Sequence, residues 1–77
     1  MNTVDTVKIE RALATEMTKI AKEPVTVSYE EDKTFYCFGS ELACHRIAYH
    51  HSHNYNKKVI VQYSENLKTF FAGIYSA

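Results

Sequence analysis

The chain has 77 residues, enough for a single domain, and its 45% hydrophobic and 23% charged residues are typical of a globular protein and argue against disorder. Nine basic and nine acidic residues give a formal net charge of zero. The composition therefore shows none of the basic excess that marks most nucleic-acid binders, and low charge repulsion between copies favours self-association. Without a basic leader or a long apolar run, we expect no signal peptide, no membrane span and a cytoplasmic location with reduced thiols.

The first half of the sequence predicts a helix followed by a β-hairpin. Apolar residues recur at helical spacing, and Pro24 prevents continuation, so we expect a helix from about residue 4 to 22. Residues 25–29 alternate in β-preferring side chains, residues 30–33 form a charged turn, and residues 34–38 form the second strand. The apolar residues at helical spacing are Ile9, Leu13, Met17, Ile20 and Ala21.

The second half of the sequence predicts the same succession of elements. Ser40 is a favourable N-cap for a helix that covers residues 41–55. Residues 57–63 form an alternating strand, and a turn at residues 64–68 leads into a last strand at residues 69–75.

The two halves also match as sequence. Residues 25–36 align with residues 59–71 with one inserted residue, and both contain a V-x-V-x-Y block followed by a K-T-F block. Any two amphipathic hairpins share some of this pattern, but the shared blocks favour an internal duplication. We therefore predict an α+β fold of one domain over residues 1–77, with an internal repeat at residues 4–38 and 40–75. The duplicated α-β-β unit (αββαββ) would form a four-stranded antiparallel sheet with both helices packed on one face.

The predicted hairpins place an apolar surface on the other face of this sheet. If residues 30–33 and 64–68 are the turns, the valines and tyrosines of the leading strands face the helices. The opposite face then carries several large apolar side chains, and an exposed apolar patch usually marks an interface. A register shift of one residue, or an end segment that covers the face, would remove this surface. The predicted interface residues are Phe35, Ile60, Phe70 and Ile74.

These features favour a small, non-catalytic protein–protein interaction module. We expect an inhibitor or adaptor, of the kind that phages or mobile elements direct against a host protein, that needs no cofactor. Its partner would be another protein or a second copy of the chain in a homodimer. Catalysis is not expected, because no motif frames a nucleophile and a base together. The second of two alternatives is weak binding of single-stranded nucleic acid, since sheet aromatics stack on bases and lysines lie near the strand ends.

The first alternative, a metal-binding or histidine-switch domain, arises from the cysteine- and histidine-rich segment at residues 44–53. On a helix, Cys44 and His51 share the apolar side but lie two turns apart, about 10.5 Å along the axis, too far for one metal ion. His50 and His53 are three residues apart and could form half of a metal site. His51 is expected at the core, where burial would lower its pKa, so a histidine-based pH switch is also an alternative.

Overall fold

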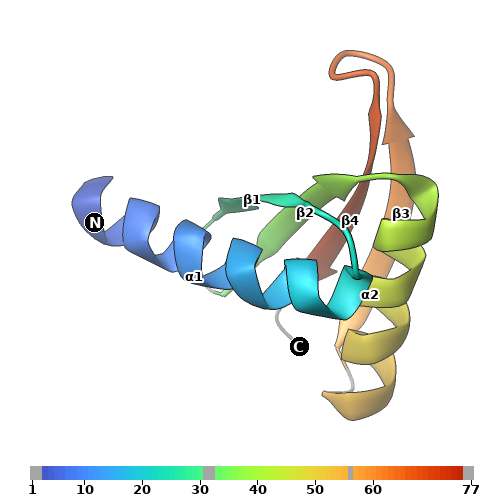
Figure 1. Cartoon of the computed structure of the whole chain (residues 1–77), viewed down its shortest axis with the longest axis horizontal. Coiled ribbons are helices and arrows are strands. Elements are labelled where there is room, and N and C mark those ends of the chain that lie inside the picture. The colour runs from blue at the N-terminus through green and yellow to red at the C-terminus, as the bar shows by residue number, and fades with distance from the viewer. Residues whose placement is uncertain (1–2, 31–32, 56, 76–77) are drawn as a thin grey trace.

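The computed structural model describes residues 3–30, 33–55 and 57–75, which form two helices and one four-stranded antiparallel sheet (Figure 1). The strand order across the sheet is β1-β2-β4-β3, so the second strand of each hairpin lies in the middle. The α+β fold and the antiparallel sheet are confirmed, and each element lies within one residue of its predicted bounds. The elements are α1 (Thr3–Ala21), β1 (Thr26–Tyr29), β2 (Phe35–Gly39), α2 (Glu41–Asn54), β3 (Lys58–Ser64) and β4 (Thr69–Tyr75).

The C-terminal end of helix α1 is stabilised by a backbone hydrogen bond and by a side chain from α2. Lys22 adopts a left-handed conformation with φ of 61°, and its N–H donates to the carbonyl of Thr18 at 2.9 Å. The guanidinium of Arg46 donates to the carbonyl of Ala21 at 2.7 Å, which pairs one of the carbonyl groups that a helix leaves free at its C-terminus. Arg46 therefore holds the end of α1 against α2.

Helix α2 begins at the N-cap residue that the sequence predicts. Ser40 is extended, with φ of −67° and ψ of 163°, and its hydroxyl accepts the N–H of Ala43 at 3.1 Å. The same hydroxyl donates to the carboxylate of Glu23, from the segment between α1 and β1. The N-cap thus ties the start of α2 to the end of the first helix.

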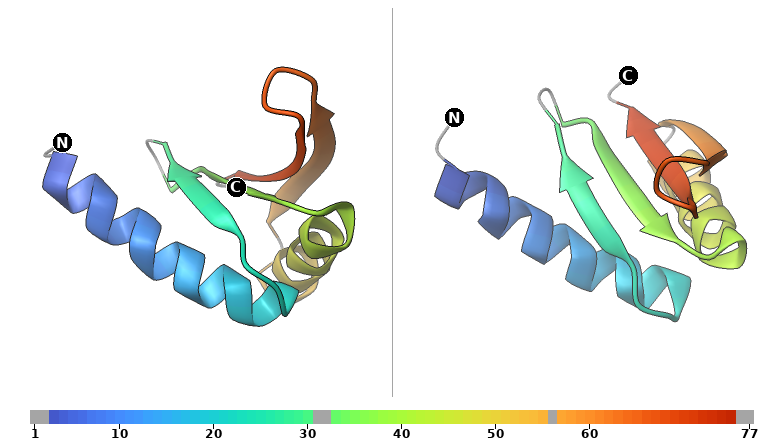
Figure 2. Two further views of the ribbon diagram at one scale, coloured as in Figure 1. Left: turned by 45° about the horizontal axis from the view of Figure 1, so that its top comes forward. Right: turned by 90° about the horizontal axis from the view of Figure 1, so that it is seen from above.

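The two helices contact different parts of the sheet. Helix α1 lies along the outer strand β1 and meets α2 near its C-terminal end, whereas α2 packs against β3 and β4 (Figure 2). The carboxylate of Glu10 accepts the N–H of Tyr29 at 2.7 Å. This bond satisfies a backbone donor that an edge strand would otherwise expose, so α1 protects this edge of the sheet.

One hydrophobic core joins both helices to the sheet. Small side chains are frequent in it, and they allow the backbones to approach closely. At Gly39 an added Cβ would lie 3.0 Å from Val25 Cγ1 and 3.5 Å from Ala43 Cβ, so the end of β2 has little room for a side chain. The buried core residues are Met17, Ala21, Val25, Phe35, Cys37, Ala43, Cys44, Ile47, Ala72 and Ile74.

The pairing of both hairpins differs by one residue from the predicted register. Glu30 donates its N–H to the carbonyl of Thr34 at 2.8 Å, and Tyr29 lies opposite Phe35 rather than Thr34. In the second hairpin Tyr63 lies opposite Phe70 rather than Thr69. Each turn is therefore one residue shorter than predicted. Residues 31 and 32 of the first predicted turn lie outside the described residues.

The final residue of each turn explains the shorter loops. Lys33 and Lys68 both have positive φ, 63° and 53° respectively, and so adopt the left-handed conformation that closes many three- and four-residue hairpin loops. Glycine or asparagine is the usual sequence sign of this conformation, and lysine gives no such sign. The loop length was therefore overestimated by one residue in both hairpins.

This shift overturns the predicted orientation of three of the four interface residues. A slip of one residue moves every side chain of a strand to the other face. Phe35 and Ile74 lie in the core with exposed fractions of 4% and 0%, and Phe70 packs against it. The prediction that these three side chains point away from the helices is wrong. Ile60, on a strand whose orientation was predicted correctly, lies on the side of the sheet opposite the core.

Candidate interaction surface

The side of the sheet opposite the core carries a cluster of aromatic residues. Because side chains alternate along a strand, the residues between the core positions of β2 and β4 project to the other side. Phe38 lies directly opposite Phe71 in the pairing of these two central strands, and every member of the cluster is half-buried. We name this cluster the outer aromatic patch, and it consists of Tyr36, Phe38, Ile60, Phe71 and Tyr75.

Two of the three ring contacts within the patch are edge to face, and the third is tilted. The ring centroids of Tyr36 and Phe71 are 6.2 Å apart with planes at 71°, and those of Tyr36 and Tyr75 are 5.9 Å apart at 85°. Phe38 and Phe71 lie 6.1 Å apart at 42°. Edge-to-face geometry of this kind is favourable for aromatic pairs, so the four rings form one mutually supported surface.

Gly73 makes this ring arrangement sterically possible. It lies on β4 between Tyr36 of β2 and Ile60 of β3 in the strand pairing. A Cβ at position 73 would lie 2.8 Å from the hydroxyl oxygen of Tyr75 and 3.0 Å from its ring, so the tyrosine occupies the space above the glycine. The pKa of Tyr36 is raised, mainly by its hydrogen bond with Tyr75. Burial and the charges of Tyr75 and Glu30 raise this pKa further.

Polar side chains surround the patch on the flanking strands. Lys58 lies opposite Tyr75, and Gln62 lies opposite Phe71. On the other side, Thr26 lies opposite Phe38. An apolar aromatic centre with a polar rim is the usual composition of a protein–protein interface.

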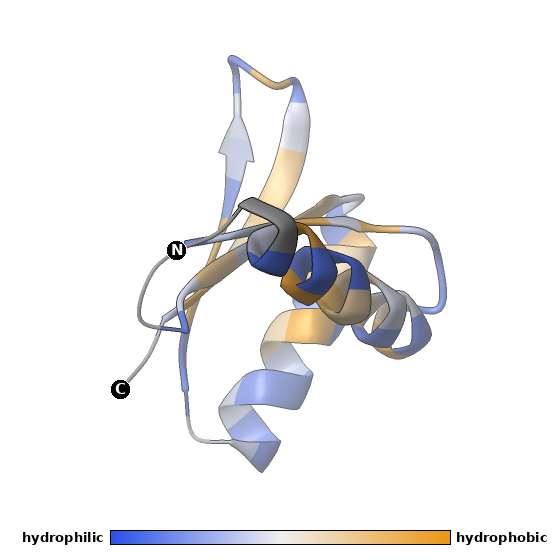
Figure 3. Ribbon diagram, turned by 90° about the vertical axis from the view of Figure 1, so that its left-hand side faces the viewer, coloured by the Kyte–Doolittle hydropathy of each residue, from blue (hydrophilic) through white to orange (hydrophobic). Residues whose placement is uncertain are grey.

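The histidines near the C-terminal end of α2 differ in burial. This part of the helix is strongly hydrophilic (Figure 3), yet His51 is only 5% exposed. Its Nε2 lies 3.3 Å from Met17 Sδ, and its ring centroid lies 5.8 Å from that of Phe35. Burial, with smaller effects from the charges of His50 and Lys57, lowers the pKa of His51 to about 4. The predicted core position of His51 and the direction of its pKa change are confirmed.

The two histidines of the metal-binding alternative contact different neighbours. His50 Nδ1 lies 3.1 Å from the side-chain nitrogen of Asn54, whereas the ring of His53 stacks on Tyr49 at a centroid distance of 4.0 Å. Within residues 3–30, 33–55 and 57–75, no group of three or more His, Cys, Asp or Glu side chains is placed to hold a metal ion. The geometry therefore gives the metal-binding alternative no support.

Both cysteines are interior residues. Cys37 and Cys44 are buried free thiols, and Cys44 Sγ donates a weak hydrogen bond to the carbonyl of Cys37 at 3.9 Å. Burial and the neighbouring Cys44 raise the pKa of Cys37 to about 12. Since the thiolate is the reactive form of cysteine, this position is unsuited to a nucleophile.

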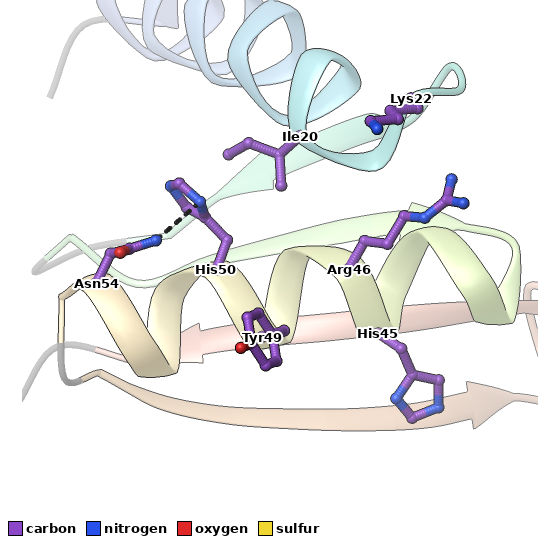
Figure 4. Close-up of a pocket in the computed structure, with 7 residues that line it drawn as sticks. All are labelled: Ile20, Lys22, His45, Arg46, Tyr49, His50 and Asn54. Carbon is purple, nitrogen blue, oxygen red and sulfur yellow. Dashed lines mark hydrogen bonds between the residues drawn. The ribbon is translucent and has the colours of Figure 1, made fainter.

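A shallow depression lies between the end of α1 and the exposed side of α2 (Figure 4). Its volume is about 450 Å³. His50 and Ile20 face each other across it, and Arg46 extends toward Lys22, while His45 points to the far side of α2. The sequence analysis missed this feature because it depends on how the helices cross. The lining residues are Ile20, Lys22, His45, Arg46, Tyr49, His50 and Asn54, none of which is acidic.

Comparisons of the chain with protein-family models, with curated proteins and with solved structures find no match. Neither described helix has the length and apolar character needed to cross a membrane.

Proposed function

We propose that this protein is a non-catalytic protein-binding module of the cytoplasm, an inhibitor or adaptor, whose outer aromatic patch is a contact surface for a second copy of the chain. The observation that carries the proposal is the position of four half-buried aromatic rings on the two central strands, on the side of the sheet opposite the core. Large aromatic side chains concentrate binding energy when a partner encloses them.

The proposed duplication of the fold supports this use of the sheet. In the order β1-β2-β4-β3 the two hairpins meet through equivalent strands, as two halves related by a pseudo-two-fold axis would. Core residues come from both helices and from the same side of β2 and β4. We infer that both helices pack on that side, which leaves the aromatic side available to a partner.

A second copy fits the patch better than a nucleic acid does. Stacking on bases needs free ring faces, but here the rings pack edge to face against one another. The zero net charge of the chain gives neither attraction to phosphates nor strong repulsion between copies. The central pair Phe38 and Phe71 can therefore pack against the same residues of another molecule across a two-fold axis.

The double variant Phe38→Asp, Phe71→Asp tests the proposal. We expect the wild-type chain to show a concentration-dependent dimer by light scattering coupled to gel filtration, and the variant to remain monomeric with an unchanged circular dichroism spectrum. Burial of two carboxylates without partners should weaken association by more than about 100-fold. A single Phe71→Ser change provides a milder version if the double variant is unstable.

Leu42→Asp is the matched control. Leu42 is 54% exposed at the start of α2, away from the patch, so the same apolar-to-acidic change should leave the dimer intact. A wild-type chain that stays monomeric at high concentration, or a double variant that dimerises like the wild type, would rule out the patch as a self-association surface.

A further inference from the structure

A line of basic residues follows the exposed side of α1 and continues onto α2. At 100° per residue, Lys8, Arg11 and Lys19 fall within a sector of about 80° around the axis of α1. Lys22 follows directly after the helix, and Arg46 reaches the same end of α1 from α2. All five side chains are exposed. We name these residues, Lys8, Arg11, Lys19, Lys22 and Arg46, the basic stripe.

The acidic residues of α1 lie outside this sector. Asp5 and Glu16 fall about 40° and 60° beyond its edge by the same helical geometry. Glu10 points elsewhere, because its carboxylate accepts the backbone N–H of Tyr29. A chain with no net charge thus places the three basic residues of α1 within one sector of the helix, apart from its acidic residues.

Two shallow depressions lie along the basic stripe. The depression of Figure 4, about 450 Å³, is lined by Lys22 and Arg46 together with His45 and His50. A second depression of about 410 Å³ is lined by Arg11 and Lys19. The other residues of this second lining are Ala14, Thr15 and Thr18, so neither depression has an acidic lining residue.

Stabilisation of α1 explains only part of this arrangement. Cations near a helix C-terminus are favoured by the helix dipole, which accounts for Lys19, Lys22 and Arg46. Lys8 and Arg11 lie in the N-terminal half of α1, where a positive charge gains nothing from the dipole. Stabilisation of the helix end therefore does not explain the N-terminal part of the stripe.

We propose that the basic stripe binds an acidic, carboxylate-rich segment of a partner protein. From residue 8 to residue 22 the stripe spans about 21 Å, the length of about six residues of extended peptide. Its cations complement aspartate and glutamate, while the threonines and Ile20 of the depressions allow packing of the intervening side chains. A short basic row on a neutral chain suits a short acidic segment better than a long polyanion such as nucleic acid.

This surface is separate from the outer aromatic patch, since its residues lie on the helices or directly after α1 and none lies on the sheet. The two proposals can therefore fail independently. A dimer formed through the patch would carry two copies of the stripe, and so would engage a partner with two acidic segments more tightly than the monomer does.

Fluorescence anisotropy with a labelled 20-residue poly-glutamate peptide tests the proposal. We expect the full chain to bind this probe with an affinity that falls as salt is added. The triple variant Arg11→Glu, Lys19→Glu, Lys22→Glu should weaken binding by about tenfold or more, because it reverses three of the five charges. Arg46 is left unchanged in this variant because its side chain also holds the end of α1.

The matched control reverses three lysines elsewhere, Lys33→Glu, Lys57→Glu, Lys68→Glu, and so changes the net charge by the same amount. It should alter the affinity by no more than about twofold, because these residues lie outside the stripe. Circular dichroism checks that both triple variants are folded. Equal losses in the two variants, no binding by the wild type at low salt, or tighter binding of a single-stranded 20-nucleotide probe than of the peptide would each overturn the proposal.

The patch variant Phe38→Asp, Phe71→Asp separates the two surfaces. It should bind the single peptide as the wild type does, and loss of peptide binding in this folded variant would contradict the assignment to α1 and α2. A wild-type chain that binds the peptide but never dimerises would leave the stripe in place and remove only the patch.

Discussion

Replacing Phe35 with alanine is expected to lower the free energy of unfolding by about 3–5 kcal/mol, the usual cost of removing a buried phenylalanine. Phe35 is 4% exposed, its ring lies against that of His51, and it is paired with Tyr29 on one side and Ile74 on the other. A domain of this size has a total stability of about 4–12 kcal/mol. At the lower end of this range, the substitution should leave a large unfolded fraction at room temperature or slightly above.

Phe71→Ala is the control that distinguishes the observed register from the predicted one. Phe71 is half-buried on the opposite side of the sheet, where it contacts Tyr36 and Phe38, so its loss should cost about 1 kcal/mol. Urea unfolding followed by circular dichroism measures both variants, at a protein concentration low enough that the chain is monomeric, so that loss of a dimer contact does not add to the effect of Phe71→Ala. A larger loss for Phe71→Ala than for Phe35→Ala would show that the hairpins pair as the sequence analysis predicted.

Mild acid is expected to destabilise the protein through His51. The ring is buried, its Nδ1 has no hydrogen-bond partner among the described residues, and the pKa in the folded chain is about 4 against an ordinary value of 6.5. Between these two values the unfolded chain binds a proton at this residue and the folded chain does not. Stability should therefore be fully present above pH 6.5 and fall as the pH decreases toward 4, by about 1–2 kcal/mol at pH 5.

His51→Leu should flatten this pH dependence, because leucine takes up no proton in either state. His53→Gln is the matched control, since His53 is exposed, and it should retain the wild-type dependence. Urea unfolding of the wild type and both variants at pH 7 and pH 5 gives six free energies of unfolding, and so one pH-dependent difference for each of the three proteins. Parallel losses in the wild type and in His51→Leu would assign the acid sensitivity to other groups.

The sequence predicts the elements of this fold well and their pairing less well. Helical spacing, the Ser40 N-cap and alternating strands are local signals, and each is present in the printed sequence. The register depends on whether Lys33 and Lys68 adopt positive φ, which is decided by the fit of the whole hairpin and not by the preference of lysine. A one-residue error there exchanged the two faces of β2 and β4.

For the candidate surfaces too, local sequence patterns predict some features, whereas others depend on contacts between distant parts of the chain. The core position of His51 follows from helical periodicity alone, and the structure confirms it. The sequence predicts an apolar patch on the side of the sheet away from the core but assigns the wrong phenylalanines to it, because its membership depends on register. The meeting of Lys22 with Arg46 depends on the packing of α1 against α2, and no short sequence pattern specifies it. The internal duplication stays a prediction.

Gly73 is a position where a substitution would alter the outer surface of the sheet and not the core. Its neighbours on β4, Ala72 and Ile74, are fully enclosed, whereas the space above its own Cα is filled by the ring of Tyr75. A single added methyl group at this position would push that ring aside and change the contour that a partner meets, with the hydrophobic interior left as it is. A Gly73→Ala variant would thus keep the core of the domain and present a different outer surface.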